Sequence, residues 1–231
     1  MGQGHHHGER AFEAFLRARR TPYVSVNEAR RTLVPSEGTG AGNLKNFDFV
    51  AYTTAKGGRA NLLVDIKCRQ LPACRTNLRL VGADGITRPV THSRSPYPRL
   101  ENWATREDIR SLKAWQELFG PGFKAAFVFV YWCETGNPNG KNGSSATGLN
   151  QPPDGLFDEV FLQDGRWYAI RGLLIDDYEP AMKDRSTRWQ TVDIPPSQFE
   201  RLSSDFGRTW LGDGKADRTH LPLSAARAAG R

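Results

Sequence analysis

Two aspartates stand inside apolar stretches of the chain, where an ionised carboxylate is costly unless something compensates its charge. Asp48 lies within Phe-Asp-Phe-Val, and Asp65 lies within Leu-Leu-Val-Asp-Ile-Lys. Because side chains alternate between the two faces of a strand, Asp65 and Lys67 share one face. We expect a hairpin turn at residues 56–58 (Lys-Gly-Gly), and strand pairing through it would bring Asp48 alongside Asp65.

Two carboxylates and a lysine on one surface are a natural site for a divalent metal. The carboxylates of Asp48 and Asp65, together with the backbone carbonyl of Ile66, would supply oxygen ligands to Mg²⁺ or to Mn²⁺. Lys67 would hold or polarise the attacking water and offset the charge of a phosphate. The pattern therefore predicts a metal-dependent hydrolytic site.

A helix predicted over residues 9–20 adds two candidate acids. The apolar residues on one side of this helix are Phe12, Phe15 and Leu16. At about 100° per residue, Glu9 lies roughly 70° from the centre of the apolar face and Glu13 roughly 110°. Glu9 is therefore the better placed to reach the sheet. For Glu13, an acid near a helix N-terminus, a purely structural role is the stronger interpretation.

The elements that must position these residues follow the order α-β-β-β-α-β. Helices are expected at residues 9–20 and 106–119, and strands at residues 23–26, 46–53, 60–69 and 124–133. The strand at 124–133 is apolar at nearly every position, which predicts burial on both faces.

The second part of the chain is read as an extension of the same domain. A Gly-, Asn- and Pro-rich stretch over 134–155 predicts a long mobile loop. Beyond it we expect strands at 156–162, 166–175 and 189–194 and a helix at 196–206, with a tight turn at Asp164-Gly165 and another turn at Asp176-Asp177. The predicted division is a flexible tail at 1–8, a core at 9–133, additions at 156–214 and a polar tail at 215–231.

The charge of the chain is unevenly spread. Its 231 residues carry a net charge of +7. Residues 1–133 hold 20 Lys and Arg against 11 Asp and Glu, a net of +9, whereas residues 134–231 hold 12 against 14, a net of −2. A basic segment favours an anionic partner, of which nucleic acid is the commonest. The alternative is an Arg-rich composition that reflects a GC-rich genome.

Several classes of protein lack support in the sequence. The longest strongly apolar run, residues 125–132, is far shorter than the ~20 residues that span a bilayer. Three cysteines, Cys68, Cys74 and Cys133, form neither a disulfide framework nor a zinc-site spacing, and no secretory signal opens the chain, so we expect a cytoplasmic protein. Neither a P-loop nor a dinucleotide-binding glycine motif is present.

In this order of elements, Glu9, Asp48 and the sequence Asp65-Ile66-Lys67 resemble the PD-(D/E)XK nuclease superfamily. The resemblance is to the branch that contains archaeal Holliday-junction resolvases and related restriction-endonuclease-like proteins, and it covers roughly residues 8–133. It implies an α/β, restriction-endonuclease-like fold with a mixed central sheet flanked by helices, to which the later hairpin and helix are additions. Phe47 stands where proline is common in the superfamily.

The resemblance also implies roles for individual residues. Asp48 and Asp65 would bind the metal, Lys67 would assist the water, and Glu9 or Glu13 would orient the metal or its water. Phosphate contacts would come from Arg69, Gln70 or Arg110. The second acid is Asp rather than the more frequent Glu, which the motif allows.

The function predicted from these features is a Mg²⁺-dependent endonuclease that hydrolyses phosphodiester bonds in DNA, and related nucleases are often homodimers. The alternative is a module of the same fold that binds nucleic acid or a protein without cleaving. A separate, purely structural interpretation is that Asp65 and Lys67 form an ordinary ion pair on the exposed face of an edge strand. The sequence does not decide between DNA and RNA, or between endonuclease and exonuclease activity.

Overall fold

The computed structural model describes residues 3–26, 44–53, 60–71, 79–81, 87–89, 99–134, 157, 160–203 and 206–211. Its helices are α1 (Gln3–Ala18), α2 (Arg106–Phe119), α3 (Ile175–Ala181), α4 (Pro196–Ser203) and α5 (Phe206–Leu211). Its strands are β1 (Tyr23–Ser25), β2 (Phe49–Ala51), β3 (Asn61–Gln70), β4 (Arg79–Val81), β5 (Thr87–Pro89), β6 (Ala104–Thr105), β7 (Phe123–Glu134), β8 (Val160–Gln163), β9 (Arg166–Leu174), β10 (Lys183–Ser186) and β11 (Thr191–Asp193).

A mixed sheet of six strands forms the centre of the fold, in the order β1-β2-β3-β7-β9-β8. Strands β3 and β7 run parallel, from Asn61 beside Phe123 to Gln70 beside Trp132. The other neighbours are antiparallel. The helix α2 makes the crossover between the two parallel strands, as a parallel connection requires. The long strands β3 and β7 therefore form the centre of the sheet, and the other strands pair on either side of them.

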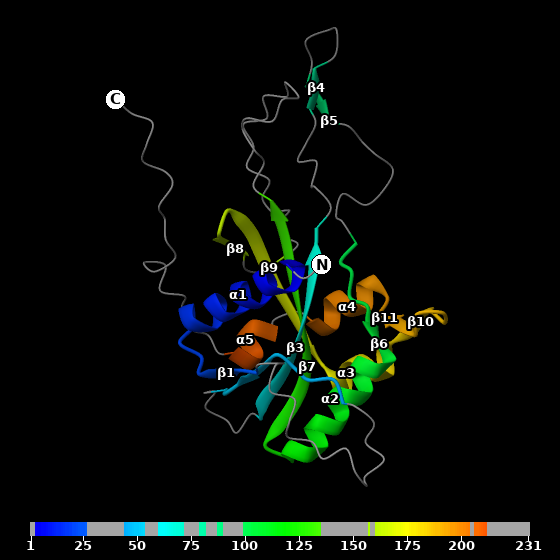
Figure 1. Ribbon diagram of the computed structural model, residues 1–231. Coiled ribbons are helices and arrows are strands. Elements are labelled where there is room, and N and C mark those ends of the chain that lie inside the picture. Colours follow the sequence, from blue (N-terminus) through cyan, green and yellow to red (C-terminus); the bar gives the residue numbers. More distant parts are fainter. Residues whose placement is uncertain are drawn as a thin grey trace.

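Helices cover both faces of this sheet (Figure 1). Along β7, alternate side chains enter opposite cores, because successive residues of a strand point to opposite faces. Phe127 and Phe129 pack with residues of α2, α3 and α4, whereas Val128 and Val130 pack with residues of α1 and α5. The predicted burial of this strand on both faces is thus confirmed, with Phe127 to Val130 fully inaccessible.

A smaller sheet of β10, β11 and β6 lies next to the α2 side of the molecule. Its strand β6 runs directly into α2, so the N-terminus of that helix is fixed between the small sheet and the central one. The turn of the β10–β11 hairpin reaches the same helix, since the Arg106 backbone N–H donates to the Gln190 carbonyl at 2.9 Å. This arrangement holds the first turn of α2 close to the end of β3.

Two predictions for helices need correction. The first helix begins at Gln3 rather than Glu9. Its extra turns pack closely on the sheet, because Gly8 has no side chain and a Cβ there would lie 2.7 Å from the Cys68 Sγ. Asp176 and Asp177 do not form a loop turn but belong to the first helical turn of α3. Acidic side chains are stabilising there, because they interact with the positive end of the helix dipole.

Most other predicted elements are confirmed within one to four residues, and the helix at 106–119 matches in full. The predicted tight turn has positive φ angles at Asp164 and Gly165. The hairpin turn at 56–58, Cys74, the tail at 215–231 and all of the 134–155 loop except Glu134 lie outside the described residues.

The architecture is a mixed central sheet flanked by helices, consistent with a restriction-endonuclease-like fold, and it carries the predicted α-β-β-β-α-β core. Within the described part of the chain, no helix is both long and apolar enough to cross a membrane.

Candidate active site

The register of β2 against β3 brings the two predicted acids together. Phe49 lies opposite Val64, and the Asp48 backbone N–H donates to the Val64 carbonyl at 2.8 Å. Asp48 therefore faces the stretch of β3 that carries Asp65. The charge of Asp65 is felt at Asp48, where it contributes to a raised pKa. The expected pairing of the two strands is confirmed.

Asp48 also closes the end of the β2–β3 ladder. Its Oδ2 accepts a hydrogen bond from the backbone N–H of Ile66 at 2.6 Å. This carboxylate oxygen replaces the backbone carbonyl that a longer β2 would have offered to Ile66. The N–H and C=O of one strand residue point toward the same edge. The Ile66 carbonyl is thus directed toward the edge at which the Asp48 carboxylate lies.

Lys67 is held between two carboxylates on the face of β3 that looks toward α2. Its Nζ lies 3.0 Å from Asp65 Oδ2 and 3.2 Å from Asp108 Oδ2, and 5.4 Å from the centre of the Phe127 ring. Burial opposes the charged form of Lys67, but the charges of Asp65 and Asp108 outweigh it and raise the lysine pKa. Lys67 is therefore a fixed ammonium group, suited to stabilising negative charge.

Asp108 comes from the first turn of α2 and was not predicted. It forms a capping box with Thr105: the Asp108 N–H donates to Thr105 Oγ1 at 3.1 Å, and the Thr105 N–H donates to Asp108 Oδ2 at 2.9 Å. Its Oδ1 lies 3.0 Å from the Nζ of Lys45, which also pairs with Glu107 at 3.1 Å. The Thr-x-x-Asp spacing before an amphipathic helix was the available sequence signal.

The pKa values of the carboxyl groups in this cluster are shifted in opposite directions. Burial and the charge of Asp65 raise the pKa of Asp48 to about 7, with a further contribution from Glu9. Burial, reinforced by the charge of Asp108, also raises the pKa of Asp65. By contrast, Lys67, Thr105 and Lys45 overcome burial and lower the pKa of Asp108 to about 2. Asp48 and Asp65 form a buried pair of carboxyl groups that lacks the positive charge needed to ionise readily, whereas the charge of Asp108 is compensated by its partners.

The two candidate helix acids occupy different places. Glu9 lies close enough to Asp48 and Cys68 for its charge to raise the pKa values of both groups. Glu13 lies further along α1, where its Oε1 accepts hydrogen bonds from Arg17 and from the Tyr23 hydroxyl, each at 2.6 Å. The structure brings Glu9, but not Glu13, toward the carboxylate pair.

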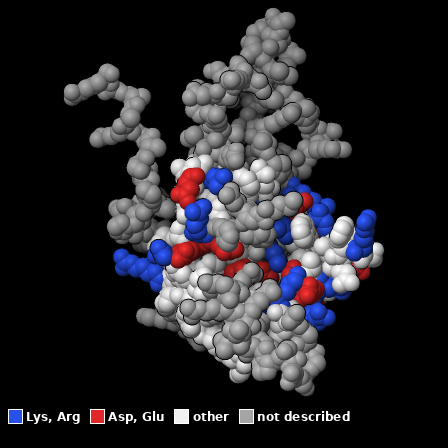
Figure 2. Space-filling view, in the orientation of Figure 1, with Lys and Arg blue, Asp and Glu red and all other residues white. Residues whose placement is uncertain are grey.

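The three candidate phosphate contacts differ in position and in exposure. Gln70 is exposed at the end of β3, and Arg110 is exposed on α2. Arg69 is more constrained, because its Nη2 donates to the Trp103 carbonyl at 2.7 Å and its guanidinium lies 4.0 Å from the centre of the Trp103 ring. Figure 2 shows acidic side chains in a band across the middle of the molecule, with basic side chains on both its left and its right.

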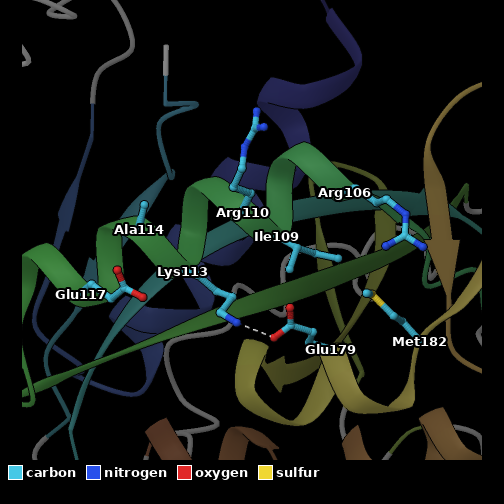
Figure 3. Close-up of a pocket in the computed structure, with 8 residues that line it drawn as sticks. All are labelled: Arg106, Ile109, Arg110, Lys113, Ala114, Glu117, Glu179 and Met182. Carbon is cyan, nitrogen blue, oxygen red and sulfur yellow. Dashed lines mark hydrogen bonds and ion pairs between the residues drawn. The ribbon is translucent and has the colours of Figure 1, made fainter. Parts of the chain in front are cut away.

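A hollow of about 360 Å³ lies between α2 and α3, apart from the carboxylate cluster. Its lining residues come mainly from the outward face of α2 and are Arg106, Ile109, Arg110, Lys113, Ala114, Glu117, Glu179 and Met182. Lys113 and Glu179 form an ion pair of 2.6 Å across it, and Arg110 points away from Glu179 (Figure 3). None of the acids near Lys67 lines this hollow.

The donor set of the buried pair suits a hard divalent cation. The contacts of Asp48 and Asp65 with other described residues use Oδ2 of each, which leaves the two Oδ1 atoms and the Ile66 carbonyl as oxygen ligands. An added cation would also supply the positive charge that the pair lacks. Within the described residues, no group of three or more His, Cys, Asp and Glu side chains is arranged to hold a metal ion.

Comparisons with known proteins add little. No protein-family model matches the chain, and no curated protein matches it. Among solved structures, the chain is similar to Hjc, a Holliday junction resolvase of the archaeal hyperthermophile Archaeoglobus fulgidus. The TM-score is 0.38 at 13% sequence identity, covering 84% of this chain and 89% of that chain. A similarity of this size does not establish a shared activity.

Proposed function

We propose that the chain is a metal-dependent nuclease that hydrolyses phosphodiester bonds in DNA. The observation that carries the proposal is the meeting of Asp48 and Asp65 through the β2–β3 register, with the Lys67 ammonium 3.0 Å from Asp65. Catalysis of phosphodiester hydrolysis requires an activated water and stabilisation of the negative charge that develops on the phosphoryl oxygens. This cluster holds groups for both.

In the proposed site, Asp48, Asp65 and the Ile66 carbonyl hold one Mg²⁺ or Mn²⁺. The bound ion polarises the phosphate and lowers the pKa of coordinated water. Lys67 remains protonated, so it donates hydrogen bonds to the attacking water or to a phosphoryl oxygen. Asp108 keeps the Lys67 ammonium in position, and Glu9 adds negative charge on the α1 side of the pair.

The proposal is tested by Mg²⁺-dependent cleavage of plasmid, linear and branched DNA, with an RNA of matched sequence beside them. We expect Asp65→Asn and Lys67→Ala each to lower the rate by about a hundredfold or more, because each removes a group that acts on the transition state. Glu117→Gln, an exposed change on α2, is the matched control and should leave the rate unchanged. Melting temperatures verify that each variant is folded.

Equal cleavage by the wild type and all three variants would contradict the assignment. A second function is favoured by one observation: Lys67 already pairs with Asp65 and Asp108, as it would in a structural ion cluster. In that case the protein would bind nucleic acid or a protein without cleaving it. Salt-sensitive DNA binding by the wild type, with no cleavage in Mg²⁺ or Mn²⁺, would support this second function.

A further inference from the structure

Arginine and tryptophan side chains associate in two groups, one at the end of β3 and one at the tip of the β10–β11 hairpin. The Arg69 guanidinium lies 4.0 Å from the centre of the Trp103 ring, and the Arg185 guanidinium lies 5.7 Å from the same centre. At the hairpin tip, the Arg188 guanidinium lies 5.0 Å from the centre of the Trp189 ring. These five residues are called the Arg–Trp strip below.

The indole of Trp189 is held in solvent by an ordered turn. The side chain is 67% exposed, which is unusual for the largest aromatic residue. The Trp189 backbone N–H donates to Ser186 Oγ at 3.3 Å, and the Gln190 backbone N–H donates to the Thr187 carbonyl at 3.3 Å. The backbone of the turn therefore places the Trp189 side chain in solvent, where its ring offers a flat apolar face to a partner.

Both ends of the Arg–Trp strip are tied to the candidate active site. At one end, Arg69 is two residues beyond Lys67 on the same face of β3. At the other, the Gln190 carbonyl accepts the N–H of Arg106, which opens α2, and Asp108 in the same helical turn lies 3.2 Å from the Lys67 Nζ. A ligand that lies along the strip would thus lie close to the elements that carry Lys67 and Asp108.

The charge of the strip fits a polyanion. Lys183, Arg185 and Arg188 are exposed on the hairpin, and Lys and Arg side chains gather on this side of the molecule in Figure 2. Three acids lie among them: Asp184 pairs with Arg106, Glu101 lies 3.5 Å from Arg185, and Asp193, opposite Lys183, pairs with Arg99. Cations interleaved with aromatic rings recognise nucleic acid whose bases are unpaired, because the rings stack on bases and the cations contact phosphates.

We propose that the Arg–Trp strip binds unpaired nucleotides beside the scissile bond, with a base stacked on Trp189 and phosphates contacted by Arg185 and Arg188. In this arrangement Arg69 and Trp103 lie beside the bound strand, on the side nearest Lys67. The substrate class is then DNA with a single-stranded segment next to the cleavage point. This inference builds on the proposed nuclease function, but the binding itself does not require cleavage.

The test measures binding in EDTA, where no metal-dependent cleavage occurs. Fluorescence anisotropy would compare a labelled single strand, a fully paired duplex and a duplex with a single-stranded overhang. We expect Trp189→Ala to weaken binding of the single strand and the overhang by about tenfold and to change duplex binding little. Trp189→Phe should retain most of the affinity, because phenylalanine still stacks.

Leu118→Ala is the matched control, since Leu118 is 68% exposed on α2 and lies outside the strip. It should bind all three DNAs as the wild type does. Equal losses of Trp189→Ala on duplex and single strand, or no loss on either, would overturn the inference. Failure of the nuclease proposal has a different signature: the wild type would not cleave in Mg²⁺, while the Trp189 effect on single-strand binding would persist.

Discussion

Lys67 owes its charge to two carboxylates rather than to solvent. Its side chain is only 15% exposed, and burial alone would favour the neutral amine. Asp65 and Asp108 reverse that preference and raise the Lys67 pKa. Because one of these partners, Asp65, is also a proposed metal ligand, Asp108 is the contact that keeps Lys67 charged and in place when a metal binds Asp65. Asp108 is thus a positioning residue.

Asp108→Asn should lower the Lys67 pKa while leaving the metal ligands in place. The asparagine oxygen can still accept the Thr105 N–H, so the helix cap is retained. We expect cleavage at neutral pH to fall about tenfold, and the loss of activity at high pH to begin at a lower pH than in the wild type. The control is Glu107→Gln, which removes an acid from the same turn that pairs with Lys45 but not with Lys67. Identical pH–rate profiles for both variants would contradict this role.

Asp48 gives the metal-free protein a distinctive dependence on pH. Its pKa is about 7 in the folded chain against an ordinary value of 3.8, so the folded state holds the proton more tightly than the unfolded state. The contribution of Asp48 to the free energy of unfolding therefore decreases as pH rises from about 4 to 7 and is absent above that range. Asp48→Asn removes this penalty, and at pH 8 in EDTA it should stabilise the protein by about 2 to 4 kcal/mol.

Thermal melts at pH 5 and pH 8, with EDTA or Mg²⁺, would measure this effect. At pH 8 Mg²⁺ should raise the melting temperature of the wild type by several degrees, and at pH 5 by much less, since a protonated Asp48 is a poor ligand. The Asp48→Asn variant should respond little to Mg²⁺ at either pH. Wild-type and variant curves that run in parallel across this pH range would refute the assignment.

Among the elements, the start of α2 connects three parts of the molecule. Thr105 ends β6, caps α2 and orients Asp108, which in turn contacts Lys67. The neighbouring Arg106 N–H bonds the β10–β11 turn. The position of Lys67 therefore depends on a helix cap in addition to its own strand.

Thr105→Ala should cost stability and activity together. Loss of the Oγ1 acceptor removes one cap hydrogen bond, worth about 1 kcal/mol, and leaves Asp108 less fixed. We expect a lower free energy of unfolding in urea and a several-fold lower cleavage rate under conditions where the variant is folded. Thr105→Ser keeps the hydroxyl and should restore both. A variant that loses stability but cleaves at the wild-type rate would show that Asp108 does not depend on the cap.

The elements with a strong repeating pattern were predictable from sequence. Period-two alternation was enough to place Asp65 and Lys67 on one face of β3, and helical spacing located α2. Asp108 was not predicted as a partner of Lys67, nor Lys45 as a partner of Asp108, because these contacts depend on how α2 packs against β3. The helix α3 was mistaken for a turn, since its stability comes from buried contacts of Tyr178 rather than from a local signal.

At the scale of the whole molecule, the basic and acidic parts of the chain share one sheet. Strand β7 pairs with β9 from Ala126 beside Leu174 to Glu134 beside Arg166. Both cores also draw on later residues: Tyr178 and Phe199 on the α2 side, Tyr168 and Phe206 on the α1 side. The boundary in charge near residue 134 is therefore not a boundary in packing.

It follows that residues 1–134 should not fold alone, although they carry every proposed metal ligand. Without β9, one edge of β7 loses its hydrogen-bond partners, and Phe129 and Val130 lose apolar neighbours on opposite faces of the sheet. We expect this fragment to lack a cooperative thermal transition by circular dichroism and to cleave no DNA. A fragment of residues 1–211 retains every residue of both cores and should melt cooperatively. Cooperative folding of residues 1–134 would instead make the later strands and helices a dispensable addition, because the αβββαβ core would then close its own sheet.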